Sequence, residues 1–469
     1  MRRPLTIYIA YEDGSSPIYV AHPTENLLVE LEMYDPGAPD QDVVQIVEEA
    51  RDGAEIASAN IRNPTGRIVG LIPQTDEADN YRQILADLLE QARDYQRTRL
   101  GKRVFLYEQR SANSPVWRSE IVAGRYRSDA SVIEEIGMTG PQRRLTILFT
   151  RRYYWEGDEV ALPLTNRNGT AVTTPLSISG HHDASNDNFV SLGPVAGEMP
   201  TPPIVKIKNT LDSTNRMREV YLALNSRSLP DTFSHILQGE AAASGGTTET
   251  AAAASGGQYR RFTWSATTET EAISWDLSSS LLNACRGNFF RIMMWLHNSV
   301  SLGSNVMEVR FDVQFLLSTI YQSRWAAIRT GKRLQETVSL QLPPYLVGAG
   351  DLYPLKLVMF VKAEYAGSKT LDVDFLQLSP LDGWRKLTPK GYGAANGVTL
   401  TDDMTTGHVY TEGWATAGKT GHYLSDGPPM MLRPRQAQRL YFLMGGMSSD
   451  TIARTATVQV SYRPRRVAI

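Results

Sequence analysis

The feature that most constrains the fold is a strict alternation of polar and apolar residues, which recurs in segments spread over the chain. It is clearest in residues 308–315 and returns in residues 371–375 and 455–462. Successive side chains of a strand point to opposite faces of a sheet, so each segment predicts a strand with one packed and one solvated face. Residues 355–361 predict a more deeply buried strand. Many such strands separated by Gly, Pro, Asn and Ser predict antiparallel sheets arranged as sandwiches.

One segment has a helical period instead. Apolar residues recur there at steps of three and four: Tyr81, Ile84, Leu85, Leu88, Leu89, Ala92 and Tyr95. Thr75 or Asp76 can cap the start, acidic residues of the first turn suit the helix dipole, and Gly101 lies just past the end. The stripe predicts an amphipathic helix that lies across a sheet formed by strands near residues 68–72 and 104–108.

The length of 469 residues predicts two or three domains, because single cores stop growing near about 250–300 residues. A strand at residues 145–150 is followed by turn-forming residues, so the first domain is expected to end near residue 158. Residues 239–257 are nearly all Ala, Gly, Ser and Thr, which predicts either a flexible linker or loops at the mouth of a domain.

An acidic stretch, residues 34–58, precedes the helix and begins with Asp35-Pro36-Gly37-Ala38-Pro39. This run prevents a regular element from starting early. Two interpretations stay open. The stretch is an arm that reaches a neighbouring subunit, or it is a local surface loop with a short helix around residues 43–50.

Charge and cysteine content exclude several classes. The 48 basic and 50 acidic side chains nearly cancel, so no overall field draws the chain onto nucleic acid or an anionic membrane. Local basic clusters at Arg143-Arg144, Arg151-Arg152 and residues 463–466 are interpreted as strand ends or contacts with acidic neighbours. Cys285 is the sole cysteine, which excludes an intrachain disulfide, and its apolar neighbours favour a core position over a nucleophile. No signal peptide and no membrane-spanning run are expected.

The sequence offers little catalytic chemistry. Residues 181–183 (His-His-Asp), with Asp187 beyond, form the one compact cluster of potential metal ligands, but adjacent side chains on an extended segment diverge, which favours a polar loop. Asp372 and Asp374 share a strand face and could resemble the paired carboxylates of glycosidases, although alternation explains them more simply. Phosphate-binding, nucleophile-elbow and HExxH motifs are absent from the sequence. We therefore predict no catalytic, cofactor-binding or metal-binding residue, no cofactor and no enzymatic activity.

Five tryptophans fall in the middle of the chain, where a sugar site would use rings for stacking; the core interpretation is favoured over that one. They are Trp264, Trp275, Trp295, Trp325 and Trp384.

The order of elements in the first third resembles the distal tail proteins of long-tailed phages, which share a sandwich-plus-helix fold with tail-tube subunits. The resemblance rests on the strand-rich start, the helix, residues 102–107, Trp117 and residues 145–157. Two further segments, 202–210 and 218–224, are similar to paired strands of phage tail proteins with appended sandwiches.

Residues 438–443 and 455–462 resemble the partners of that pair. This implies a discontinuous sandwich, residues 159–235 plus 390–469, with residues 236–389 inserted. The insert resembles galactose-binding-like jelly rolls of carbohydrate-binding modules at residues 239–241 and 254–259.

The expected fold is thus mostly β: a tail-tube-like sandwich with one packed helix (residues 1–158), then two jelly-roll-like sandwiches, one inserted in the other. The resemblance implies a structural subunit of a phage tail, most readily a distal tail protein forming a trimeric or hexameric ring around the tail axis. The alternatives are a tail-tube subunit and a virion module that binds host glycans; a glycosidase ranks last. Implied partners are copies of the chain, the tube, tape measure and hub proteins, with DNA only as passing cargo, in a virion assembled in the host cytoplasm.

Overall fold

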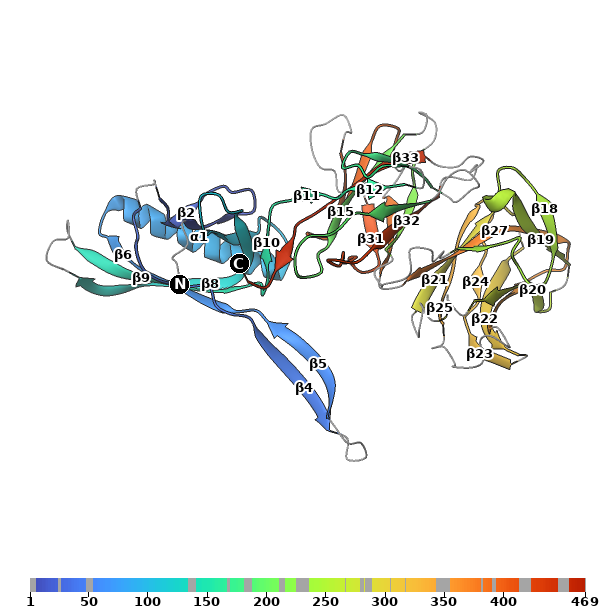
Figure 1. Cartoon of the computed structure of the whole chain (residues 1–469), viewed down its shortest axis with the longest axis horizontal. Helices are drawn as coiled ribbons and strands as arrows, with labels where there is room; N and C mark the ends of the chain where they lie inside the picture. The colour runs from blue at the N-terminus through green and yellow to red at the C-terminus, as the bar shows by residue number, and fades with distance from the viewer. Residues whose placement is uncertain are drawn as a thin grey trace. The chain divides into compact units, whose positions relative to one another are not determined.

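The structure is a computed structural model that describes residues 6–23, 27–47, 54–133, 141–166, 169–180, 188–210, 216–224, 236–265, 267–278, 282, 289–303, 305–316, 318–342, 355–380, 383–389, 394–412, 423–445 and 455–468 (Figure 1). It is mostly β, with several sandwich sheets and, in this part of the chain, one α-helix, α1 (Asp76–Thr98). The predicted fold class is confirmed. The chain divides into two compact units.

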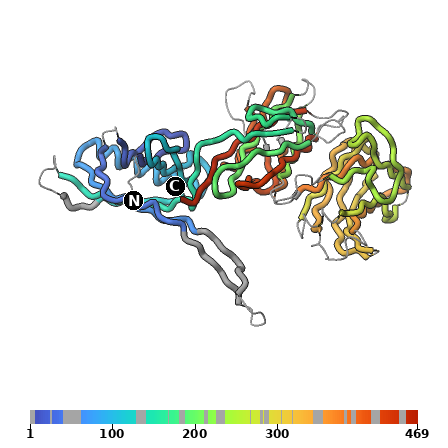
Figure 2. The backbone as a smooth tube through the Cα atoms, viewed as in Figure 1, coloured from blue at the N-terminus to red at the C-terminus, as the bar shows by residue number. Residues whose placement is uncertain are grey.

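Unit 1 comprises Met1–Glu159, Gly197–Met199 and Arg463–Ile469, so both ends of the chain belong to it (Figure 2). Its nine-stranded antiparallel sheet has the order β2-β1-β7-β8-β9-β6-β3, with β34 joined to β8 through β10. The strands are β1 (Thr6–Tyr11), β2 (Ile18–Ala21), β3 (Glu30–Asp35), β6 (Thr65–Pro73), β7 (Val104–Gln109), β8 (Trp117–Ile133), β9 (Gln142–Arg151), β10 (Trp155–Glu156) and β34 (Arg465–Arg466).

Helix α1 confirms the predicted amphipathic helix. Thr75 caps its start by accepting a hydrogen bond from the backbone N of Ala78 at 3.2 Å, and Arg99 ends it in the left-handed conformation. The predicted stripe is buried apart from partly buried Ile84, and from Tyr81 to Ala92 it forms one core with the sheet, including Ile68, Leu106 and Ile147. Burial of that stripe, more than helix propensity, holds the helix in place.

Strands β4 (Asp40–Val47) and β5 (Ala54–Arg62) form a separate two-stranded antiparallel ladder, in register from Asp40↔Arg62 to Val47↔Ala54. The alternative of a short helix around residues 43–50 is wrong for residues 43–47, and the remaining three lie outside the described residues. Four of those five residues are Val or Ile, whose branched side chains favour strands.

Unit 2 comprises Val160–Ala196 and Pro200–Tyr462 and contains two sandwiches. The split sandwich pairs the sheet β11-β33-β15-β29-β30, joined by β13, with the sheet β12-β14-β32-β16-β28-β31, and it has a core of its own. Its strands are β11 (Val160–Ala161), β12 (Leu164–Thr165), β13 (Leu176–Ser179), β14 (Phe189–Leu192), β15 (Pro203–Asn209), β16 (Glu219–Leu224), β28 (Trp384–Pro389), β29 (Thr399–Asp403), β30 (His408–Glu412), β31 (Tyr423–Asp426), β32 (Gln438–Gly445) and β33 (Thr455–Tyr462).

The expected partners of the split sandwich are found: β33 pairs with β15, and β32 pairs with β16. However, β15 and β16 lie in opposite sheets and do not pair with each other.

The middle sandwich consists of β17 to β27, which lie in the chain between β16 and β28. Its sheets are β18-β19-β27-β21-β25, joined by β17, and β20-β26-β22-β23, joined by β24. A third large core lies between them. The strands are β17 (Ile236–Gln238), β18 (Thr247–Thr250), β19 (Gln258–Trp264), β20 (Thr270–Leu277), β21 (Phe289–Leu296), β22 (Met307–Phe315), β23 (Ser318–Gln322), β24 (Ala326–Ala327), β25 (Leu334–Gln341), β26 (Leu355–Ala363) and β27 (Lys369–Pro380).

The predicted strands β22, β26 and β27 are confirmed. The prediction that β22 and β27 each have one solvated face is wrong. In β27 both faces are buried, and in β22 the polar residues Arg310 and Asp312 are buried with an ion pair at 2.9 Å. Alternation does not reveal that a second layer covers the polar face.

For β27, part of the layer that covers the polar face is the split sandwich. Apolar residues of both sandwiches form one buried cluster: Tyr221, Ile236, Met293, Trp295, Leu334, Phe375, Trp384 and Leu443. Polar contacts flank it, among them Asn188 Nδ2 to Gln377 Oε1 at 2.7 Å and Lys386 Nζ to Glu336 Oε2 at 2.6 Å. We call this contact the joint.

Candidate assembly site and polar hollow

The β4–β5 hairpin extends the ladder between β3 and β6. That ladder runs from Glu30↔Leu71 to Asp35↔Arg67, and the next paired positions along both strands are those of the hairpin, beginning at Asp40↔Arg62. We call residues 34–37 and 62–66, where the sheet passes into the hairpin, the root. An isolated two-stranded hairpin is at best marginally stable in water, so the hairpin is the element of unit 1 that most needs a partner.

The root is tightly built. The Tyr34 hydroxyl donates to Glu108 Oε2 at 2.6 Å, and the Asp35 carboxylate accepts from the backbone N of Gly37 at 2.9 Å. Burial, with the Glu108 charge beside it, raises the pKa of the Tyr34 hydroxyl well above its ordinary value. The hydroxyl therefore remains a donor at physiological pH.

Glycines let the two strands of the root approach closely. Gly37 has a φ of 73°, and a Cβ there would lie 2.4 Å from the carbonyl oxygen of Thr65. A Cβ at Gly66 would lie 2.4 Å from the ring of Phe149. Both positions require glycine, the first for its conformation as well as for space.

Strand β3 is the edge of the sheet and pairs, among the described strands, with β6 alone. Its side chains are mostly exposed, and Met33 is 50% exposed. An unpaired strand edge is a template for another strand. The edge of β3 and the hairpin together form the candidate assembly site.

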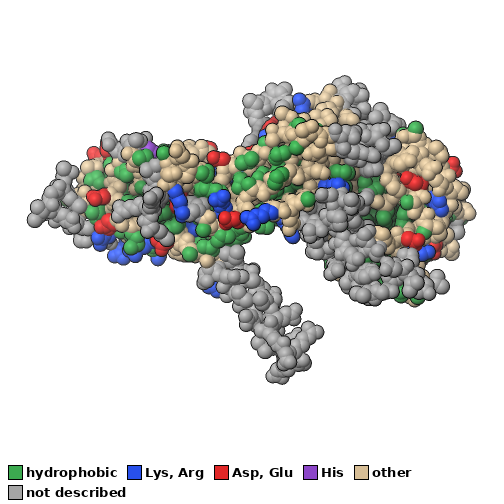
Figure 3. Space-filling view, viewed as in Figure 1, with side chains coloured by type: hydrophobic (Ala, Val, Ile, Leu, Met, Phe, Trp, Pro, Cys, Tyr) green, Lys and Arg blue, Asp and Glu red, His purple; other side chains and the backbone are tan. Residues whose placement is uncertain are grey.

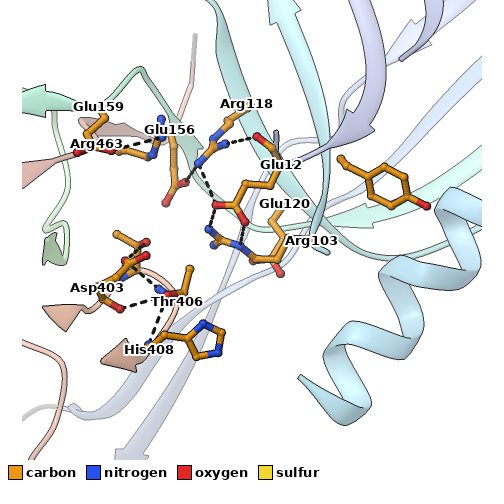
Figure 4. Close-up of polar contacts among 12 residues, drawn as sticks. Glu12, Arg103, Arg118, Glu120, Glu156, Glu159, Asp403, Thr406, His408 and Arg463 are labelled. Atoms are coloured by element: carbon orange, nitrogen blue, oxygen red, sulfur yellow. Dashed lines mark hydrogen bonds and ion pairs between the residues drawn. The ribbon is translucent and has the colours of Figure 1, made fainter. Parts of the chain in front are cut away.

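Elsewhere in unit 1, an ionic cluster contains Glu156, Arg118, Glu12 and Arg103 (Figure 4). Arg465 of the C-terminal strand β34 also binds Glu156. Glu156 accepts two hydrogen bonds from Arg465, at 2.7 and 3.1 Å, and lies 3.8 Å from Arg118. Arg118 also lies 3.8 Å from Glu12, which is paired with Arg103. Burial alone would raise the pKa of Glu156, but Arg465 and Arg118 outweigh it and lower that pKa.

The middle sandwich has a polar hollow of about 550 Å³ at its surface. Hydroxyl groups of Ser and Thr are frequent in its lining. The lining residues are Arg261, Thr263, Asn298, Ser299, Val300, Ser301, Ser368, Lys369, Thr370 and Asp372. Asp372 accepts from Arg261 Nε at 2.8 Å and Nη2 at 3.1 Å, and from Asn298 Nδ2 at 2.7 Å. These bonds fix the charged wall of the hollow before any ligand arrives.

Two further side chains hold Arg261 in place. Arg261 donates to the Tyr259 hydroxyl at 2.7 Å, and the Tyr259 ring stacks on His297 with centroids 4.4 Å apart. Burial, aided by the Arg333 charge, lowers the pKa of His297, so its imidazole is neutral near pH 7. Asp372 offsets Arg261, which leaves Lys369 as the remaining charge of the lining, and most of the other lining groups are hydroxyls.

The two carboxylates considered as a glycosidase-like pair, Asp372 and Asp374, have different surroundings in the structure. Asp372 belongs to the hollow, whereas Asp374 is buried and accepts from the backbone N of Ser255 at 2.7 Å. With Asp372 bound to Arg261 and Asn298, the two do not form an accessible carboxylate pair. The cluster of residues 181–183 with Asp187, and Cys285, lie outside the described residues. Within the described ranges, no group of three potential metal ligands and no helix able to cross a membrane occurs.

The tryptophan prediction is confirmed for Trp264, Trp275, Trp295 and Trp384, which are buried. Trp325 is partly buried, with Lys362 Nζ 4.4 Å from its ring centroid.

The basic clusters meet acidic neighbours, as expected: Arg144 binds Glu32 and Arg152 lies 3.3 Å from Glu120. Charges of both signs are scattered over the face shown in Figure 3. Arg151 is the exception, since it is buried, forms no ion pair with a described carboxylate and contacts the root. Neither this contact nor the hollow was predicted, because both are assembled from strands distant in the sequence.

No protein-family model and no curated protein matches this chain. Among solved structures, it is similar to a chain of the phage P2 baseplate in its activated conformation with Ca, with 10% identity, a TM-score of 0.29, and coverage of 98% of this chain and 97% of that one. It is also similar to the Dit (gp 19.1) protein of phage SPP1, described as a paradigm of hub adsorption apparatus in phages that infect Gram-positive hosts, with 9% identity, a TM-score of 0.27, and coverage of 79% of this chain and 98% of that one. A chain of infectious bursal disease virus is similar with 10% identity, a TM-score of 0.15, and coverage of 74% and 82%.

Proposed function

We propose that this protein is a structural subunit of a phage tail or tail-like particle, and that unit 1 forms a ring around the tail axis in the manner of a distal tail protein. The observation that carries the proposal is the hairpin: a two-stranded ladder that continues from an open sheet edge and pairs with no other described strand. In a closed ring, each copy completes the unfinished edge of the next.

In this proposal the chain has three functional domains: residues 1–158 form the ring, and residues 159–235 with 390–469, together with the inserted residues 236–389, decorate its outside. The ring would contain three or six copies and bind tube, tape measure and hub proteins. DNA would pass through the lumen without specific contacts, in keeping with a formal net charge of −2.

Mass photometry and cryo-electron microscopy of the purified full chain test the proposal. We expect one closed ring of defined order in which the hairpin contacts the next copy. A chain that stays monomeric at high concentration and never occurs in assembled virions would refute it. Rings that stop at one or two layers support the distal position, whereas indefinite stacking supports the alternative of a tail-tube subunit.

A second candidate function is binding of a host-surface glycan, and the polar hollow favours it. Asp372 fixes the Asn298 amide and the Arg261 guanidinium, and hydroxyl groups line much of the rest, which suits a ligand that presents several hydroxyl groups. A glycan array probed with the intact chain tests this candidate. Thr370→Trp fills the hollow and should abolish the signal, whereas Thr319→Trp on the exposed strand β23 should preserve it. If the unaltered chain binds no glycan, this candidate is refuted.

A further inference from the structure

Arg151 lies at the end of β9 and is 1% exposed. Burial of a guanidinium removes its hydration, and such groups are ordinarily paired with a carboxylate. Among the described residues, however, no carboxylate lies within ion-pair distance of Arg151. Burial lowers its pKa to about 10, an effect that the nearby Tyr34 and Glu108 partly offset. The side chain is still charged at neutral pH.

Backbone carbonyls take the place of the missing carboxylate, and two of them belong to the root. Arg151 Nε donates to the carbonyl of Pro36 at 2.8 Å, and Nη2 donates to that of Gly37 at 2.9 Å. Nη1 donates to the carbonyl of Arg152 at 2.8 Å. The guanidinium carbon lies 4.5 Å from the ring centroid of Trp155, which adds a cation–π contact.

The same residue also holds the second strand of the root. The backbone N of Arg151 donates to the carbonyl of Pro64 at 3.1 Å, and β9 pairs with β6 from Thr65 onward. Arg151 thus binds the chain both where it enters the hairpin and where it leaves.

We infer that Arg151 is a positioning residue that fixes the direction in which the β4–β5 hairpin leaves the sheet. The planar guanidinium presents its donors in a rigid fork. Two of these donors, Nε and Nη2, have acceptors only when the carbonyls of Pro36 and Gly37 lie at their present positions. Any other course of the chain through the root leaves Nε and Nη2 of this buried charge without their acceptors, so alternative hairpin directions are disfavoured. This inference rests on the proposed function only where the hairpin is treated as the assembly element.

The test measures the hairpin directly in the full chain. In a Cys285→Ser background, nitroxide labels are attached at Glu55→Cys in β5 and at Glu90→Cys on the exposed side of α1, and their distance distribution is recorded by double electron–electron resonance. We expect one narrow distribution with Arg151 present. Arg151→Met should widen it at least twofold, and Arg151→Lys should give an intermediate width, because an ammonium is a point charge without the fork. Arg97→Gln, at a side chain that is 77% exposed, should leave it unchanged.

The second readout is ring formation by mass photometry, for which Arg151→Met should require at least tenfold higher concentration. The circular dichroism of α1 reports whether each variant folds, and Arg151→Lys keeps the test valid if Arg151→Met does not. Distributions as narrow in both variants as in the parent overturn the inference. If the parent never forms rings but the variants widen the distribution, the positioning role stands and the assembly proposal falls.

Discussion

Replacing Glu156 by glutamine tests how the last strand is held in unit 1. Glutamine keeps the shape of the side chain and one carbonyl acceptor for Arg465, but it removes the charge. Glu156 is 3% exposed, and it is the hydrogen-bonded carboxylate of Arg465. Without the Glu156 charge, Arg465 loses its counter-charge, and Glu12 at 3.8 Å is the one described carboxylate that Arg118 retains.

Breaking a buried pair on one side costs about 3–5 kcal/mol, because the remaining charge is left buried. For a unit of about 150–250 residues, each kcal/mol lowers the melting temperature by roughly 2–4 °C. We therefore expect the calorimetric transition of unit 1 to fall by roughly 6–20 °C in Glu156→Gln. The transition of unit 2 should not move. Guanidinium unfolding followed at α1 supplies the free energy independently.

The matched control is Glu90→Gln, whose exposed partner Arg93 lies at 3.5 Å; exposed pairs contribute about 0–1 kcal/mol. The double change Glu156→Leu with Arg465→Met replaces the pair by apolar groups and should recover at least half of the loss, since no charge of the pair is left over. A loss below about 1 kcal/mol in Glu156→Gln would refute the reasoning, because the pair would then behave like an exposed one.

Three further outcomes are expected. First, the pKa of Glu156 is lower in the folded state than in the unfolded state. Its contribution to the stability of unit 1 is therefore complete above the unfolded pKa of about 4.3 and is lost as the pH falls through the lower folded pKa. Melting curves of unit 1 from pH 7 to 3 should show this decline, and Glu156→Gln should flatten it. Second, Gly37→Ala should destabilise the root by about 1–3 kcal/mol, seen as faster hydrogen exchange in residues 34–37. Third, residues 236–389 expressed alone expose their side of the joint, so they should bind a hydrophobic dye or self-associate, and Phe375→Ser should reduce both effects.

Local patterns were sufficient for much of the fold. The stripe from Tyr81 to Tyr95 predicted α1 because a helix has a period that strands lack, and alternation located β22, β27 and β33. The same patterns failed where one layer covers another. The alternation predicts a solvated position for Asp374. The residue is instead buried and accepts a hydrogen bond from the backbone N of Ser255, a contact that cannot be predicted from local periodicity.

The candidate sites were less predictable than the elements. The acidic stretch was identified as a candidate arm from Pro36, Gly37 and their neighbours, but its strands could not be distinguished from a short helix. Arg151 was grouped with Arg152 as one basic cluster, although the first is buried and the second binds Glu120. Adjacent residues of a strand face opposite sides, so their environments depend on what each side of the sheet meets.

Long strand edges explain why the proposed assembly surface falls in unit 1. An open edge has to be short, covered or paired with another chain. In unit 2 the two eight-residue edge strands are covered: β25 contributes Leu334 to the joint, and β20 is met by Ser244, whose hydroxyl lies 2.6 Å from that of Ser274. The exposed edge strand β23 has five residues. In unit 1 the edge strand β2 is short, with four residues. Among the described strands, β3 pairs in a ladder with β6 alone and the hairpin strands pair with each other alone, so in the proposed ring a second copy would complete them.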